Sequence, residues 1–189
     1  RFKKLHLQHH ADERLTDPFD DPESYYIALW KHEKLPGWFK AVLRVNNTLA
    51  GRFVLNPLLG SFGLMAMDFK AALNGDCHVI DAWARHLAGA IIVAATVQFI
   101  FAIPLWLYLL VPCWIGQSII AIRTYAEHQW HETPEGRTII VERSPLSILF
   151  LNNNLHLVHH KLPTAPWYRL PLLFAERRAE WVALNKGYV

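Results

Sequence analysis

Two clusters of histidine with the same spacing lie near opposite ends of this chain. Residues 6–10 read HLQHH and residues 156–160 read HLVHH. On a helix, positions i, i+3 and i+4 lie on one side, so each cluster predicts three imidazoles directed at one point. Two such trios could meet across a shared centre, formed by His6, His9, His10, His156, His159 and His160.

Imidazole groups in this number indicate a metal site. Neutral imidazole binds iron, zinc, copper and nickel, and six or more histidines without thiolates favour a redox metal cluster over a structural zinc. Cys77 and Cys113 form neither a CxxC motif nor a disulfide framework. One HxxHH cluster can arise by chance or as a surface feature. Two copies in one chain, beside a long uncharged hairpin, argue for a metal.

The first trio needs a helix to present it. Residues 1–10 are predicted to be the end of a helix, and Pro18 and Pro22 predict a loop over the acidic residues 11–24. Residues 25–45 mix aromatic and basic side chains, which suits a helix along a membrane surface, although an amphipathic core helix fits equally well. Residues 53–67 are uncharged but short and interrupted by Pro and Gly, which makes them a poor spanning helix. We expect this segment either to be interfacial or to pack beneath the cap.

The longest uncharged stretch runs from residue 87 to residue 122. As one helix it would measure about 54 Å, against a hydrocarbon core of about 30 Å. Two spans fit better, and Pro104 divides the stretch into 87–103 and 105–122, whereas a break at Pro112 leaves unequal pieces. The alternative is a buried helical hairpin of a soluble protein. We therefore predict a transmembrane hairpin over about 87–122.

Charge places the ends of this hairpin on one side of the membrane. Arg85 and Arg123 flank the stretch and nothing charged lies at its turn, which predicts that both ends face the cytoplasm. Both trios then lie on the cytoplasmic face. We predict an all-α integral membrane protein, with residues 1–189 forming one domain that carries a histidine-rich helical cap. The chain ends in a predicted charged helix, AERRAEWVALNK.

Bulk composition agrees with a membrane protein. Hydrophobic residues make up 52% of the chain, with eight Trp and ten Phe. The formal charge is only +3, and no nucleic-acid-binding motif is present, so we expect no nucleic-acid partner.

At several places the sequence resembles the membrane fatty acid desaturase superfamily, which also contains hydroxylases. The resemblance is carried by HLQHH (6–10), RTYAEH (123–128), NNLHLVHH (153–160) and LPTAPWYRLP (162–171). It implies a cytoplasmic di-iron centre held by histidine boxes above a helical membrane domain. By position, the two trios match the second and third boxes, and His128 matches an additional histidine ligand. His128 also follows the second predicted span directly, five residues after Arg123.

The family's first histidine box is absent from this sequence. We expect it upstream of Arg1, together with a further hairpin, and we expect the chain as given to be inactive by itself. Four other histidines could act as substitute ligands, but a surface or interfacial position is favoured for each of them. They are His131, His32, His78 and His86.

Other side chains are candidates for supporting roles. Metal-bound imidazoles usually donate their second N–H to a carboxylate or a carbonyl. The candidates, each of which is equally compatible with a solvated loop or a helix cap, are Asp12, Asp17, Asp20, Asp21 and Glu127. Asn152 and Asn153 are expected to cap the helix of the second trio or to bond a ligand. Trp167 and Tyr168 are expected to line an acyl channel or to anchor the chain at the interface.

The resulting functional hypothesis is an oxygen-dependent di-iron desaturase that introduces a double bond into a fatty acyl chain or lipid. The cofactors would be two iron ions, with dioxygen as co-substrate. Because no flavin, nicotinamide or haem motif is present, electrons must come from a partner such as a ferredoxin, a cytochrome b-type carrier or a rubredoxin-type carrier. The alternatives are a hydroxylase of a lipid, alkane or carotenoid on the same scaffold, and a non-catalytic membrane remnant.

Overall fold

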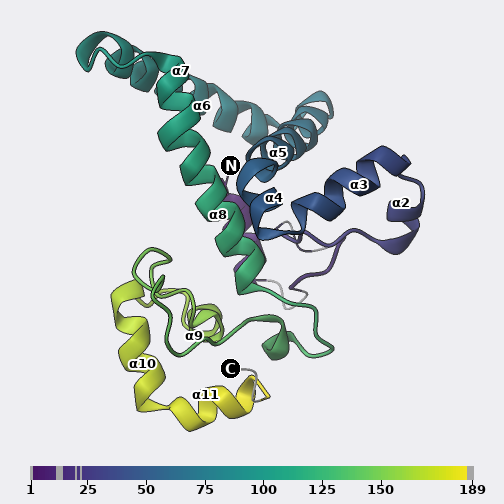
Figure 1. Cartoon of the computed structure of the whole chain (residues 1–189), viewed down its shortest axis with the longest axis vertical. Helices are drawn as coiled ribbons and strands as arrows, with labels where there is room; N and C mark the ends of the chain where they lie inside the picture. Colours follow the sequence, from purple (N-terminus) through teal and green to yellow (C-terminus); the bar gives the residue numbers. More distant parts are fainter. Residues whose placement is uncertain (1, 12–14, 20, 22, 187–189) are drawn as a thin grey trace. The chain divides into compact units, whose positions relative to one another are not determined.

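The computed structural model describes residues 2–11, 15–19, 21 and 23–186, and in this part of the chain the regular elements are all helical. Two isolated β-bridges are the only extended pairings among these residues. The predicted all-α class is therefore confirmed. The chain divides into two compact units (Figure 1). We call Leu35–Ile122 the helical unit, and we call Phe2–Lys34 with the chain from Arg123 onward the histidine unit.

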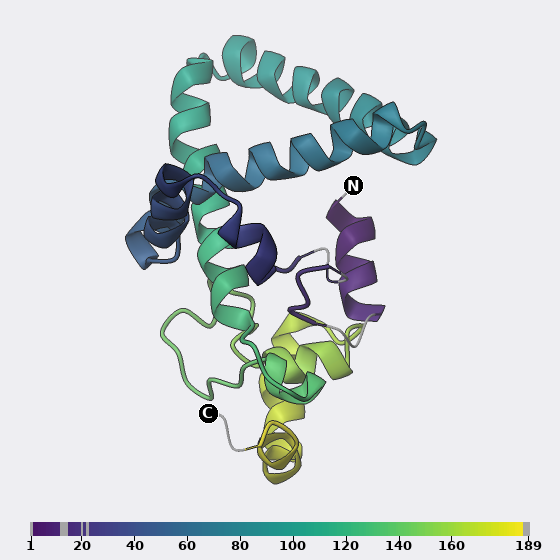
Figure 2. The ribbon, with the colours of Figure 1, turned by 90° about the vertical axis from the view of Figure 1, so that its right-hand side faces the viewer.

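The helical unit contains most of the long helices. In chain order they are α3 (Gly37–Asn46), α4 (Leu49–Val54), α5 (Asn56–Leu73), α6 (Cys77–Ala95), a π-helical turn Thr96–Ile100, α7 (Leu105–Tyr108), a second π-helical turn Leu109–Cys113, and the beginning of α8 (Trp114–Glu127). A tight turn joins α5 to α6 (Figure 2). The indole of Trp83 on α6 donates to the buried carboxylate of Asp68 on α5 at 3.0 Å, which fixes this pair.

Two continuous helical stretches are long and apolar enough to cross a membrane, Cys77–Ile100 and Leu105–Glu127. Their most apolar windows are only 6% and 11% buried, whereas the core helix of a soluble protein would be mostly buried. The chain breaks between the two stretches, where Ala102 adopts a positive φ of 53° and Pro104 precedes the first turn of α7. Pro112 lies inside the second stretch, in its π-helical turn.

Both stretches extend beyond the uncharged residues that predicted them. The first begins ten residues before Leu87, and the second continues five residues past Ile122. The added turns carry charge in i,i+4 ion pairs, Asp81 with Arg85 and Arg123 with Glu127. Such pairs lie on one side of a helix and stabilise it, so the helix does not end where charge begins.

Two other helix predictions need correction. The single helix expected over 25–45 is two helices, α2 (Leu29–Glu33) and α3, because Pro36 caps α3 and disfavours helical backbone just before it. Most of the uncharged segment 53–67 belongs to a longer helix, α5, which begins at Asn56 and continues to Leu73. Pro57 occupies its first turn, where a missing N–H costs nothing.

Close packing at Gly51 gives a stability prediction for the helical unit. A Cβ at this position would lie 1.8 Å from the backbone oxygen of Val45. We expect Gly51→Ala to lower the free energy of unfolding by about 1–3 kcal/mol, because the backbone of α3 must move. Gly63→Ala is the matched control, since its Cβ meets nothing within 4 Å. It should stabilise α5 by up to about 1 kcal/mol. Thermal unfolding in detergent, followed by circular dichroism, separates the two variants, and equal melting temperatures would contradict the prediction.

The histidine unit is built from short helices around a small core. Its elements are α1 (Phe2–Ala11), α2, the last turn of α8, a 3-10 turn Pro134–Arg137, α9 (His156–Lys161), a 3-10 turn Trp167–Arg169, α10 (Leu170–Glu176) and α11 (Arg178–Leu184). The predicted charged helix at the end of the chain is α11 alone, because Arg177 leaves helical geometry between α10 and α11. The core consists of Ile140, Leu155, Leu157, Val158, Leu170, Phe174 and Trp181.

An extended segment, residues 138–141, ties the histidine-bearing parts of this unit together. Thr138 forms an antiparallel bridge with His128, and Ile140 forms one with Leu155. Ile139 donates its N–H to Glu127 and accepts from the N–H of His156 at 3.0 Å. The backbones that carry His128 and His156 are therefore held on either side of one short segment.

The C-terminal helices support that segment from behind. The side chain of Asn185, which is 1% exposed, donates to the backbone oxygens of Glu135 and Thr138 at 2.7 and 2.9 Å. The 3-10 turn and the start of the extended segment are thereby fixed to the end of α11.

Candidate metal centre

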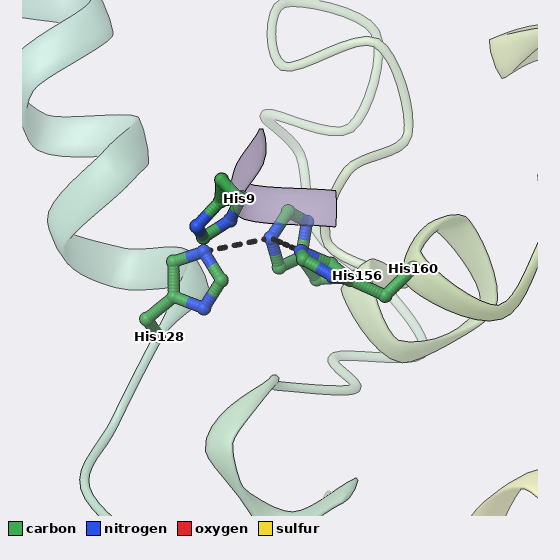
Figure 3. A group of neighbouring side chains, drawn as sticks. All are labelled: His9, His128, His156 and His160. Atoms are coloured by element: carbon green, nitrogen blue, oxygen red, sulfur yellow. Dashed lines mark hydrogen bonds between the residues drawn. The ribbon is translucent and has the colours of Figure 1, made fainter. Parts of the chain in front are cut away.

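All seven histidines predicted as ligands lie together in the histidine unit, in two groups. In each group, one ring nitrogen from every member lies within 4.8 Å of one from every other. The four-histidine group contains His9, His128, His156 and His160, and Figure 3 shows these rings directed toward one another. The three-histidine group contains His6, His10 and His159.

The trios are shared between the two groups, which corrects the expectation that each trio points at one site. His6 and His10 of the first trio join His159 of the second, while His156 and His160 join His9. Helical geometry explains the exchange, because residues i and i+4 are about 40° apart around the axis, whereas i+3 and i+4 are about 100° apart. The i+3 ring of each helix therefore reaches the pair on the other helix.

Ring contacts show how closely the two trios approach. The ring centroids of His10 and His160 are 4.3 Å apart, and those of His9 and His160 are 4.9 Å apart. His10 and His159 are separated by 4.6 Å. Rings of the two groups are therefore direct neighbours. The arrangement suits two ions close to each other rather than two distant metal sites.

His128 reaches the four-histidine group from the residue after α8. Its ring centroid lies 4.5 Å from that of His156 and 4.8 Å from that of His9. The phenol of Tyr25 donates to the backbone oxygen of His128 at 2.7 Å, opposite the bridge to Thr138. Two backbone contacts thus fix the point from which this ring extends.

The ring nitrogens face one another in a way that hydrogen bonding alone does not satisfy. The Nε2 atom of His156 lies 3.1 Å from Nε2 of both His128 and His160. A single Nε2 atom either donates or accepts, so it cannot serve both neighbours in opposite roles. A cation binds the lone pairs of all three, and this donor set fits a first-row transition metal.

Burial keeps these imidazoles neutral. It lowers the pKa of His10, His128 and His159 to about 4, with repulsion from neighbouring histidines as the next cause. Burial and neighbouring histidines also lower the pKa values of His156 and His160 well below 6.5. Since a metal binds only the deprotonated ring, the site is prepared for a cation at neutral pH.

Carboxylates orient two of the rings from outside. Nδ1 of His9 donates to Oδ1 of Asp21 at 2.8 Å, as expected for one of the acidic candidates. The N–H of Thr16 also donates to Asp21. Burial raises the pKa of the Asp21 carboxyl, but the hydrogen bond from His9 and those from the backbone outweigh it, so the pKa is lowered. Asp21 therefore remains ionised and fixes the tautomer of His9.

The second of these carboxylates, Glu23, was missed by the sequence analysis. Nδ1 of His6 donates to Oε1 of Glu23 at 2.9 Å, and this bond raises the pKa of His6. The signal available was its place two residues after Asp21. Among the other acidic candidates, Asp17 accepts from the N–H of Phe19 in its own turn. Asp12 and Asp20 lie outside the described residues.

Glu127, also an acidic candidate, touches the centre in a different way. Its Oε1 accepts from Nε of Arg123 at 2.5 Å and from Nδ2 of Asn153 at 2.8 Å. Its Oε2 lies 3.9 Å from Nε2 of His156. The capping role expected for Asn153 and Asn152 is not found, because no side chain caps α9 and Asn152 donates instead to the backbone oxygen of Trp167.

The remaining histidines do not join either group within the described residues. His131 accepts from the N–H of Thr133 inside its own loop. His78 and His86 are exposed on α6, and His32 lies on α2. Trp167 and Tyr168 pack edge to face at 5.9 Å with 42% and 64% exposed surface. An acyl channel lined by these two residues stays a prediction.

The contact between Asp21 and His9 gives a testable expectation. We expect Asp21→Asn to weaken metal binding by about 10–100-fold, because a neutral amide fixes the His9 tautomer less well and makes the ring less basic. Competition with a chelator measures the change. Asp81→Asn, which removes an exposed carboxylate on α6, is the control. Equal affinities of the two variants would show that Asp21 does not support the ligand.

Comparison with known proteins identifies one family. The family model described as "Fatty acid desaturase" matches residues 1–189, which is the whole chain given. No curated protein and no solved structure matches the chain.

Proposed function

The chain belongs to the fatty acid desaturase family, and on this premise we propose that it is an oxygen-dependent di-iron desaturase of fatty acyl chains or lipids. Membership implies an oxidoreductase with a di-iron site, a lipid substrate and an electron donor. The finer assignments, which are the reaction catalysed, the ligand set and the side of the membrane, are proposals.

One observation carries the proposal, namely the two adjacent groups of imidazoles built from both trios and His128. We propose that one iron is held by His9, His128, His156 and His160, and the other by His6, His10 and His159. Nitrogen ligands of this type tolerate iron in both common oxidation states. The separation of the seven rings into two neighbouring sets matches a pair of ions.

The overall reaction requires an oxidant and reducing equivalents. Two neighbouring methylenes lose two hydrogens, and dioxygen with two electrons and two protons becomes two molecules of water. The iron pair, when bound, supplies the power to oxidise an unactivated C–H bond. The chain's own residues orient and protect that pair. Asp21 and Glu23 hold His9 and His6 through Nδ1, which directs Nε2 of each ring inward.

Exclusion of water is the second task of the chain. His9 and His156 are each 1% exposed, and Leu157 and Val158, which follow His156 in the sequence, are buried in the core. A dry surrounding protects a strong oxidant from side reactions and strengthens the electrostatic contacts of the ligands.

We further propose that the chain is an integral membrane protein. Cys77–Ile100 and Leu105–Glu127 contain 24 and 23 residues. As helices they would be about 35 Å long, enough for a hydrocarbon core of about 30 Å. His128 follows the second stretch directly, so the metal centre would lie where that helix leaves the membrane. Arg85 and Arg123 favour the cytoplasmic side for these ends.

Electrons must reach the centre from another protein, because the sequence carries no flavin, nicotinamide or haem motif. We propose a one-electron carrier of the ferredoxin, cytochrome b or rubredoxin type. Two deliveries from such a carrier complete one turnover.

Lipid analysis of a host that expresses the complete gene tests the function. A new double bond in the extracted acyl chains, absent from cells that express His156→Ala, supports a desaturase. A new hydroxyl group instead would assign the chain to the hydroxylases on this scaffold. Unchanged lipids, together with less than one iron per chain in the purified protein, would identify a non-catalytic relative.

A further inference from the structure

A loop before α9 presents large apolar side chains on the surface of the histidine unit. Leu146, Ile148, Leu149 and Leu151 are all exposed, and Ile148 retains 78% of its surface. No Asp, Glu, Lys or Arg lies between residues 144 and 160. Single apolar side chains are ordinary on a protein surface, but four within six residues form a patch. Patches of this kind mark surfaces that contact a membrane or another protein.

The loop has a defined shape and bonds much of its own backbone. The side chain of Ser144 accepts from the N–H of Leu146, and its backbone oxygen accepts from the hydroxyl of Ser147. At the other end, the N–H of Asn152 donates to the backbone oxygen of Ser147. The backbone N–H groups bonded within residues 144–153 are those of Leu146, Ser147, Phe150, Leu151, Asn152 and Asn153. A segment that leaves water for lipid needs such internal bonds.

Two aromatic side chains extend the exposed surface of the loop. Nδ2 of Asn152, the residue after Leu151, donates to the backbone oxygen of Trp167 at 3.1 Å, so the turn Trp167–Arg169 adjoins the loop. Trp167 and Tyr168 are both exposed. These two residue types are enriched where membrane proteins meet the lipid headgroups. We define the apolar surface as Leu146, Ile148, Leu149, Leu151, Trp167 and Tyr168.

Two observations favour a bilayer as the partner of this surface. Nδ2 of Asn153 donates to Oε1 of Glu127 at 2.8 Å, which attaches the end of the loop to the last turn of the second long apolar stretch. In addition, an exposed arginine flanks each apolar segment, since Arg143 precedes the loop and Arg169 follows Tyr168. Long basic side chains keep their charge at the lipid phosphates while neighbouring apolar side chains enter the hydrocarbon.

We propose that the apolar surface inserts into the bilayer beside the end of α8, in addition to the two proposed spans. This inference rests on the proposed membrane location of the chain. Its partner is the acyl region just below the phospholipid headgroups, at the depth of about 5–10 Å that is usual for interfacial segments. Because α9 with His156 follows the loop within a few residues, insertion holds the metal centre close to the lipid that contains acyl chains.

Nitroxide labels on single cysteines test the depth of the loop. The label is placed at Ile148→Cys or, separately, at Leu149→Cys, in the complete protein with Cys77 and Cys113 replaced by Ser. The protein is reconstituted in vesicles of phosphatidylcholine and phosphatidylglycerol. Both positions are exposed, so each label disturbs little packing, and either variant alone provides the measurement.

Power saturation in electron paramagnetic resonance compares the access of oxygen, which concentrates in lipid, with that of a water-soluble nickel chelate. We expect oxygen access to exceed nickel access at both loop positions, with a depth of about 5–10 Å. Glu132→Cys, at an exposed residue in a polar loop of the same unit, is the matched control. Its label should be reached by the nickel chelate.

A label at Phe99→Cys separates failure of this inference from failure of the proposed membrane location. Phe99 lies in the first long apolar stretch and is 82% exposed. If its label is in lipid while the loop labels are reached by nickel, the inference about the loop is overturned and the spans stand. If nickel reaches Phe99 as well, the proposed membrane location itself is wrong. Loop labels that are shielded from both reagents would show that protein covers the apolar surface, which also overturns the inference.

Discussion

We expect His156→Ala to empty the four-histidine group and to reduce desaturation by more than about 100-fold, beyond the effect of losing a residue that merely supports a ligand. His156 lies inside the four-histidine group, because its Nε2 is 3.1 Å from Nε2 of both His128 and His160. The His156 ring is 1% exposed, so solvent water does not have free access to the position that the substitution leaves empty. Iron per chain should fall from about two toward one.

His131→Ala is the matched control for this variant. His131 is a histidine of the same unit, but it bonds within its own loop and belongs to neither group. Iron content by plasma emission spectroscopy and double-bond formation by gas chromatography measure the two effects. If His156→Ala retained two iron ions and normal activity, the di-iron assignment would be wrong.

The second large effect concerns acid. In the metal-free protein, burial lowers the pKa of His10, His128 and His159 from the usual value of 6.5 to about 4, and it also lowers the pKa values of His156 and His160 well below 6.5. Between pH 6.5 and about 4 the unfolded chain takes up protons that the folded site does not. Stability therefore falls as the pH is lowered through this window, by about 1.4 kcal/mol per pH unit for each fully buried ring. His6 acts in the opposite sense, since its raised pKa stabilises the folded state at low pH.

Melting temperatures of chelator-treated protein from pH 7.5 to pH 4.5 measure this dependence. Replacing the exposed His78 and His86 by Gln should leave the curve unchanged, because these rings lie outside the centre. Addition of Fe²⁺ should flatten the curve near neutral pH, since bound metal competes with protons for the same lone pairs. A melting temperature that does not fall between pH 6.5 and pH 4.5 would contradict the predicted neutrality of the site.

Sequence patterns were sufficient where the signal was local. Histidine spacing identified six of the seven residues that the two groups contain, and the family resemblance added His128. The uncharged stretch with Pro104 identified the break between the two long apolar helices. The all-helical class followed from the same periodicities. These features depend on neighbours within a few positions, which is the range over which helical geometry is regular.

What escaped prediction depends on contacts between distant segments. The exchange of His9 and His159 between groups follows from the approach of α1 to α9, which no spacing within either cluster reveals. The role of Glu23 needs the loop after α1 to fold back on His6. Arg123 was taken as the flank of the uncharged stretch, but its ion pair with Glu127 allows α8 to continue to the residue before His128.

The exchange of histidines between the two groups also has a consequence for chain entropy. Each group takes ligands from α1 and from α9, so an ion in either one closes a loop of roughly 150 residues. Such a crosslink restricts the unfolded chain much as a disulfide of that loop size does, an effect worth about 4–5 kcal/mol in the chain-entropy model. Two ions bound side by side would crosslink the beginning of the sequence to its end at two points. In the proposed di-iron protein, loss of iron would therefore release α1 from α9 as well as remove the reactive centre.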